Sequence, residues 1–229
     1  MKHNSNPIDI YFEVGKKKIF AGSIQWPGWC RPGRDEQSAL EALLENGPRY
    51  ARVLEGTTLN FTAPTQTSEF QVVERLTGNT TTDFGAPDIP PSSDAEPIGE
   101  IELKRFESIL KACWEAFDLS VAAAAGKELR KGPRGGGRDL DGVIRHVMGA
   151  EKGYLSSMAW KQKREPGENL SEELALNRNA ILAALTSAQH GELPERGPRG
   201  GVYWKPRYFV RRMAWHVLDH AWELEDRIL

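Results

Sequence analysis

The residues with the clearest chemical potential are three histidines, His146, His216 and His220. His216 and His220 stand four residues apart in a segment, residues 213–223, whose pattern predicts a helix. Residues at this spacing share one face of a helix, with Cβ atoms about 5 to 6 Å apart. Two such imidazoles can hold one cation, and His146 from another predicted helix would supply a third nitrogen. Three protein ligands leave a divalent metal with an open position for water or substrate.

A histidine pair at this spacing also occurs in helices that bind no metal, so a structural interpretation stands beside the metal site. His216 and His220 fall on the predicted inward stripe of their helix, where Leu or Ile is usual. Buried imidazole nitrogens need hydrogen-bond partners or a cation. His146 flanks the inward stripe of its own helix. The spacing alone leaves open a metal site, a vestigial site and an ordinary core.

The first part of the chain predicts a small α+β domain over residues 1–80. Residues 8–13 and 17–25 predict a β-hairpin, and a helix is expected from Asp35 to Glu45. An Asn-Gly-Pro triplet then predicts a helix stop, because Pro cannot continue a helix and Gly readily adopts the left-handed cap. Further strands are expected at 50–54 and 69–76.

The second part predicts an all-α four-helix bundle over residues 98–229. Residues 81–97 are rich in Thr, Ser, Asp and Pro, which predicts a linker. Beyond it, apolar residues recur with helical spacing, and the third and fourth helices are expected at 170–189 and from Pro206. His146 and the His216/His220 pair lie at matching depths if the second and fourth helices are antiparallel. This favours an up-down-down-up arrangement.

Composition excludes several classes of function. The chain has 229 residues, a formal charge of −2 and a pI near 6.2, and no helix carries a basic, aromatic stripe, so a nucleic-acid partner is not expected. No apolar run reaches the roughly 20 residues that span a bilayer, and the polar start lacks the apolar core of a signal peptide. Two isolated cysteines fit a reducing compartment. We therefore expect a cytoplasmic protein with no membrane partner.

Several further residues lie close in sequence to the histidines. Glu151, Tyr154, Asp219 and Glu223 are candidates for a supporting acceptor or a general base. The aromatic and basic start of the fourth helix could bind the carboxylates of a ligand; it contains Trp204, Arg207, Tyr208, Arg211 and Arg212. Two Gly-Pro-Arg-Gly-Gly segments, 132–136 and 197–201, precede the histidine-bearing helices, and connecting loops are their simplest interpretation.

Residues 141–155 and 213–225 resemble the second and fourth helices of the DinB-like (DinB/YfiT) metalloenzyme superfamily. The resemblance covers about residues 98–229 and implies an up-down-down-up bundle that binds a divalent metal (Zn, Ni, Mn or Fe) through His146, His216 and His220. Characterised relatives activate a low-molecular-weight thiol such as mycothiol or bacillithiol for S-transfer or isomerisation. The same metal could instead lower the pKa of water for hydrolysis.

Residues 20–30 and 33–43 are similar to the strand, Pro-Gly turn and helix of a HicB-like domain. Such domains neutralise an RNase partner in toxin–antitoxin systems and usually carry a DNA-binding tail, for which this sequence shows no signal. The leading hypothesis is a metal-dependent enzyme with a small-molecule substrate. The alternatives are a metal-dependent hydrolase and a non-enzymatic, antitoxin-like interaction protein. A homodimer is compatible with each.

Overall fold

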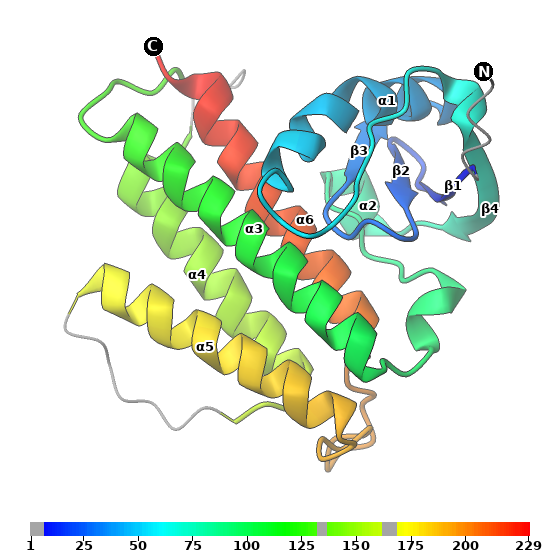
Figure 1. The fold of residues 1–229 in the computed structure, drawn as a ribbon, viewed down its shortest axis with the longest axis vertical. Coiled ribbons are helices and arrows are strands. Elements are labelled where there is room, and N and C mark those ends of the chain that lie inside the picture. Colours follow the sequence, from blue (N-terminus) through cyan, green and yellow to red (C-terminus); the bar gives the residue numbers. More distant parts are fainter. Residues whose placement is uncertain (1–6, 132–136, 162–168) are drawn as a thin grey trace. The chain divides into compact units, whose positions relative to one another are not determined.

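The computed structural model describes residues 7–131, 137–161 and 169–229, which belong to two compact units, Met1–Ala95 and Glu96–Leu229. Within the described residues, the first unit holds a mixed four-stranded sheet and the second holds four long helices (Figure 1). Each unit is described by itself below. No helix in these residues combines the length and apolarity needed to cross a bilayer.

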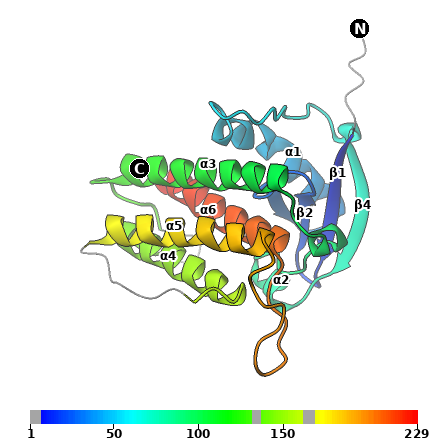
Figure 2. The same cartoon turned by 60° about the horizontal axis from the view of Figure 1, so that its bottom comes forward.

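The sheet of the first unit has the strand order β3-β2-β1-β4, and Figure 2 shows β1 between β2 and β4. The strands are β1 (Ile8–Val14), β2 (Ile19–Ser23), β3 (Cys30–Gly33) and β4 (Phe70–Thr77). β1 pairs antiparallel with β2 and parallel with β4, and β2 pairs antiparallel with β3. The expected hairpin and the strand expected at 69–76 are confirmed. β3 was not expected, because it lies in a Pro/Gly-rich segment.

The crossover between β3 and β4 contains α1 (Glu36–Val53), which begins at an Asp35 capping box with Ser38 and continues through Pro48. The expected helix stop at residues 46–48 and the strand expected at 50–54 are therefore both wrong. Proline removes one intrahelical hydrogen bond and crowds the preceding turn. The carbonyl that loses its N–H partner is that of Leu44, while the Trp29 indole Nε1 anchors the same turn by donating to the Leu43 carbonyl at 3.0 Å.

Packing after Pro48 explains why the helix continues. Tyr50 is fully buried, and its hydroxyl donates to the carbonyl of Pro27 at 2.8 Å. Its ring stacks on Trp29 with centroids 5.9 Å apart and meets the edge of Phe61 at 5.0 Å. Burial of an aromatic side chain contributes about 1.5 to 3 kcal/mol, comparable to the cost of about 3 kcal/mol for an internal proline.

The stretch that follows β4 is folded, in contrast to the linker expected at 81–97. It contains α2 (Thr80–Phe84) and the 3-10 turn η2 (Ser92–Ala95), and the compact first unit extends to Ala95. The buried carboxylate of Glu13 accepts the backbone N–H groups of Asp88 at 2.9 Å and Ile89 at 3.1 Å. A polar stretch can thus order without a large apolar surface, because a buried carboxylate on β1 satisfies its backbone.

The second unit comprises α3 (Glu100–Ala124), α4 (Leu140–Ser157), α5 (Leu170–Gln189) and α6 (Pro206–Arg227). The bounds expected for the last two helices agree with the structure. The Asn169 side chain accepts the backbone N–H of Glu172 at 3.0 Å, and Pro206 occupies the first turn of α6. Both ends follow the chemistry of helix caps.

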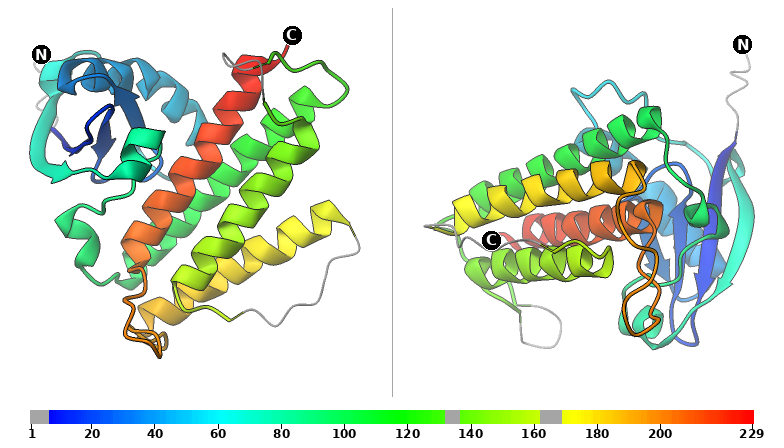
Figure 3. Two further views of the ribbon diagram at one scale, coloured as in Figure 1. Left: turned by 180° about the vertical axis from the view of Figure 1, so that it is seen from behind. Right: turned by 90° about the horizontal axis from the view of Figure 1, so that it is seen from below.

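Pairs of contacts fix the directions of these helices. Arg207 near the start of α6 pairs with Glu102 near the start of α3, and Ser120 donates to Glu225 near the ends of both helices. The two helices therefore run parallel, while α4 and α5 run the opposite way (Figure 3). The core between them is apolar and includes Leu110, Phe117, Phe209, Met213 and Leu224.

Candidate functional site

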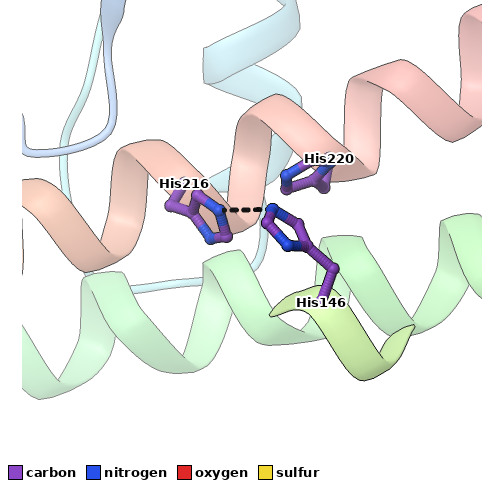
Figure 4. Close-up of side chains that lie close together, drawn as sticks. All are labelled: His146, His216 and His220. Atoms are coloured by element: carbon purple, nitrogen blue, oxygen red, sulfur yellow. Dashed lines mark hydrogen bonds between the residues drawn. The ribbon is translucent and has the colours of Figure 1, made fainter. Parts of the chain in front are cut away.

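The structure brings the three predicted histidines together on facing sides of α4 and α6. His146 reaches from α4 toward His216 and His220 on α6 (Figure 4), and one ring nitrogen from each lies within 4.8 Å of the others. The Nε2 atoms of His146 and His216 are 3.3 Å apart. The ring centroid of His220 lies 4.8 Å from that of His146 and 4.6 Å from that of His216.

The helices place these side chains by simple periodicity. His216 and His220 lie one turn apart on the inward side of α6, in line with the buried residues Met213 and Leu224. His146 is half-buried beside the fully buried Val143 and the nearly buried Val147 of α4. The flanking position of His146 therefore suffices to turn its imidazole into the seam between antiparallel helices.

Burial favours the neutral form of two of the three histidines, His216 and His146. His216 is only 7% exposed, and burial, together with the positive charge that His220 and His146 would carry, lowers its pKa to about 2. Burial, followed by the charge of His220, also lowers the pKa of His146. Neutral imidazoles present the nitrogen lone pairs that metal binding requires.

A carboxylate orients the third histidine. The Nδ1 atom of His220 lies 2.7 Å from Oε2 of Glu223, and this hydrogen bond is the largest cause of the lowered pKa of Glu223. An ionised carboxylate only accepts hydrogen bonds, so Nδ1 of His220 carries the proton and Nε2 is the nitrogen left for a ligand. A carboxylate–histidine pair of this kind commonly supports metal ligands.

Arg227 extends this support beyond Glu223. Its Nη1 donates to Oε1 of Glu223 at 2.7 Å, while its Nε and Nη2 donate to the carbonyls of Arg130 and Arg138, each at 2.9 Å. The guanidinium thus joins the last turn of α6 to the backbone that follows α3, at Arg130, and to the backbone just before α4, at Arg138. Sequence reasoning missed Arg227, because its partners are main-chain atoms distant in sequence.

The distance between two of the histidine nitrogens fits a divalent metal ion. Two nitrogen ligands of a tetrahedral ion at about 2.0 to 2.1 Å lie about 3.4 Å from each other, close to the 3.3 Å between Nε2 of His146 and Nε2 of His216. Nδ1 of His216 is buried and has no hydrogen-bond partner among the described residues. A metal bound at Nε2 would leave this Nδ1 unpaired, so the fit rests on the separation of the two Nε2 atoms and not on Nδ1.

Of the other residues that the sequence suggested as helpers of the histidines, some lie near the histidines and one lies in the core. Tyr154 lies beside the cluster, with its ring centroid 5.8 Å from that of His216, and Asp219 is half-buried on α6. Glu151 is fully buried elsewhere: its carboxylate accepts from Trp114 Nε1 at 2.8 Å and from the side chain of Asn177 at 2.9 Å. Glu151 is therefore a core acceptor, and its role as a helper of the histidines is not supported.

Only some residues of the aromatic and basic start of α6 lie near the histidines. Trp204 packs against Tyr154 with centroids 5.2 Å apart, which places its indole near the histidine seam. Arg207 instead pairs with Glu102 and donates to the carbonyls of Glu96 and Pro97. Arg212 stacks over Tyr154, with 5.7 Å from Cζ to the ring centroid. Of the arginines expected here, Arg212 is the one placed beside the histidines.

The glycine-rich segments add no second site. Residues 132–136, the first such segment, lie outside the described residues. In the second, the backbone N–H of Gly197 donates to the carbonyl of Gly201 at 2.8 Å, and that of Gly200 donates to Gly197 at 2.9 Å. These donors are used within the turn, which supports the interpretation of a connecting loop.

A comparison of the chain with family models, curated proteins and solved structures finds no match.

Proposed function

We propose that the second unit binds one divalent metal ion through His146, His216 and His220 and that the protein is a metal-dependent enzyme. One observation carries the proposal: three imidazoles from two antiparallel helices bring their nitrogens within 4.8 Å, in a setting that keeps His216 unprotonated. Three histidine ligands are typical of catalytic sites, which keep a position open.

The proposal includes membership of the DinB-like superfamily, with its up-down-down-up four-helix bundle. Support comes from the parallel course of α3 and α6, the opposite course of α4 and α5, and the position of the histidines on α4 and α6. The metal expected on this basis is Zn, Ni, Mn or Fe, all of which accept imidazole ligands.

The chemistry proposed is thiol-dependent transfer or isomerisation. A divalent metal held by three neutral ligands keeps its charge, so it would lower the pKa of a bound thiol and supply a nucleophile at neutral pH. The residues of the chain prepare this site in distinct ways. Glu223 holds the proton of His220 at Nδ1, and burial keeps His216 neutral. The Tyr154 ring meets His216 in an edge-on contact, and Trp204 packs against Tyr154.

Metal stoichiometry tests the site directly. Protein stripped with a chelator and titrated with Co²⁺ or Zn²⁺ should take up one equivalent, and the metal should raise the melting temperature by mass action. A His216→Ala/His220→Ala double variant and a His146→Ala variant should lose that uptake and shift. His190→Ala is the matched control, because His190 ends α5 in an exposed position. Equal metal uptake by the triad variants and wild type would reject the site.

Thiol binding distinguishes the reaction classes. In the Co²⁺-loaded protein, 2-mercaptoethanol should produce a saturable sulfur-to-metal charge-transfer band that is absent from His146→Ala. A spectrum that shows bound Co²⁺ but does not respond to thiols would favour metal-dependent hydrolysis instead.

For the first unit we propose a HicB-like accessory module. The support is limited to its architecture, in which a hairpin and a third strand precede a helix and a final strand pairs parallel with the first. If wild-type protein takes up no metal, the non-enzymatic alternative becomes the better account, with the histidines as core residues and the first unit as the functional part.

A further inference from the structure

Arg212 stands out among the arginines of the second unit because its described contacts are with ring faces. Its Cζ lies 4.9 Å from the ring centroid of Trp215 and 5.7 Å from that of Tyr154. Its Nη1 is shielded from water and has no hydrogen-bond partner among the described residues. By contrast, three other arginines of this unit each meet a carboxylate: Arg178 meets Asp118, Arg207 meets Glu102, and Arg227 meets Glu223.

An unpaired and poorly hydrated guanidinium N–H is costly, and a charge-assisted hydrogen bond to an anion would offset that cost. The printed partners of Arg212 are aromatic rings, which offer the guanidinium no strong hydrogen-bond acceptor. The planar fork of an arginine can donate two parallel N–H groups to the two oxygens of a carboxylate.

Arg212 lies next to the histidines. It precedes His216 by four residues on α6, a rise of about 6 Å along the helix axis, and shares its face. Tyr154 touches both, with its ring 5.8 Å from His216 and 5.7 Å from the Arg212 Cζ. A small molecule could therefore reach the histidine nitrogens and the guanidinium together.

The charges around the site favour an anion. The guanidinium of Arg212 carries a positive charge one helical turn from His216. Three neutral imidazoles would add nothing to cancel the charge of a bound divalent ion. The site would then hold a net positive charge, to which Arg212, close to the rings of Trp215 and Tyr154, would add.

We propose that Arg212 binds a carboxylate of the substrate or cosubstrate, and that the ligand of this site is a small molecule with a carboxylate about one helical turn from its metal-binding group. The inference rests on the proposed metal function and specifies its ligand class. Binding includes a rotation of the Arg212 side chain that turns its covered N–H toward the ligand. Arg212 then sets specificity, while the histidines hold the metal.

Two thiols of similar size test the proposal on Co²⁺-loaded protein. 3-Mercaptopropionate and 2-mercaptoethanol differ in the group at the far end, a carboxylate or a hydroxyl. Wild type should bind the carboxylate thiol about tenfold more tightly, as judged by the charge-transfer band, given the typical strength of a charge-assisted hydrogen bond. Arg212→Gln should reduce this preference to below twofold and leave the affinity for 2-mercaptoethanol unchanged. Arg145→Gln is the matched control, because it removes the same charge from an exposed site next to His146.

A second measurement needs no metal. In chelator-treated protein, the Nε–H NMR signal of Arg212, assigned by its absence from Arg212→Gln, should shift saturably with 3-mercaptopropionate and less with inorganic phosphate. A stronger response to phosphate would overturn the carboxylate assignment. An unperturbed signal, together with an unchanged thiol preference in Arg212→Gln, would overturn the proposal as a whole. A saturable shift in protein that takes up no metal would uphold the carboxylate site and reject the metal function.

Discussion

The Nδ1 atom of His220 lies 2.7 Å from the carboxylate of Glu223, and the same carboxylate accepts a hydrogen bond from Arg227 at 2.7 Å. These three residues occupy the last two turns of α6, so one helix carries both a candidate ligand and the groups that orient it. The metal affinity of the site should therefore depend on Glu223 and Arg227, although neither residue needs to bind the metal itself.

Replacement of Glu223 by Gln should weaken metal binding without unfolding α6. Loss of such a carboxylate partner typically costs 10- to 100-fold in metal affinity, because the histidine loses its fixed orientation and part of its basicity. Competition with a chromophoric chelator measures this change. Glu115→Gln, on an exposed position of α3, controls for the altered charge. Equal affinities in both variants would show that Glu223 does not tune the ligand.

Removal of the Arg227 guanidinium should loosen the segments that it joins. Arg227→Met loses the hydrogen bonds to the carbonyls of Arg130 and Arg138 and the ion pair with Glu223, which should cost about 1 to 3 kcal/mol. Hydrogen exchange should increase in residues 128–131 and 137–139. Unchanged exchange there would mean that other contacts hold these segments.

Glu151 should make stability depend on pH in a defined direction. Burial raises its pKa above the ordinary 4.5, so the folded state binds the proton more tightly than the unfolded state does. Its contribution is therefore largest below about pH 4.5 and declines as the pH rises through the folded pKa. Glu151→Gln keeps an acceptor for Trp114 and cannot ionise, and its amide N–H can donate to Asn177 once the Asn177 amide turns its unpaired Oδ1 toward it. The melting temperature of the variant relative to wild type should rise from pH 4.5 to pH 7.5, and a constant difference would contradict this account.

Glu13 should hold residues 79–89 on the sheet of the first unit. Glu13→Ala leaves the Asp88 and Ile89 N–H groups and the Thr82 hydroxyl without their buried acceptor. Destabilisation by about 1 to 3 kcal/mol is expected, with faster hydrogen exchange across this segment. Glu45→Ala, at an exposed position of α1, is the control. If both variants exchange alike, side-chain packing alone orders the segment.

The helices and the candidate site were largely predictable from the sequence because their signals are local. A 3.6-residue period, Asn169 and Pro206 define the helices of the second unit, and the spacing of His216 and His220 needs only one helix. The approach of His146 depends on the relative direction of two helices, and the matching depths along them gave that direction. The distance of 3.3 Å between Nε2 of His146 and Nε2 of His216 depends on how the two helices pack, and the matching depths predicted that the residues would meet.

The errors arose where a distant partner overrides a local signal. Pro48 lies inside α1 because Trp29 anchors the preceding turn at the Leu43 carbonyl and Tyr50 buries its ring beyond the proline. Residues 81–95 fold because Glu13, far away in sequence, accepts their backbone N–H groups. The composition of residues 81–95 predicts a linker because it cannot reveal that Glu13 accepts hydrogen bonds from them. Arg227 was missed for the same reason.

The parallel pairing of β1 with β4 has a consequence for the order of folding. β1 lies inside the sheet, but its outer neighbour is complete only when Phe70–Thr77 has left the ribosome. Until then, the β1–β2 hairpin exposes the edge of an apolar strand that contains the buried residues Ile10, Tyr11 and Phe12. Such an edge invites pairing with other chains. A nascent chain that pauses before Phe70 should therefore depend on chaperones far more than one that has passed it.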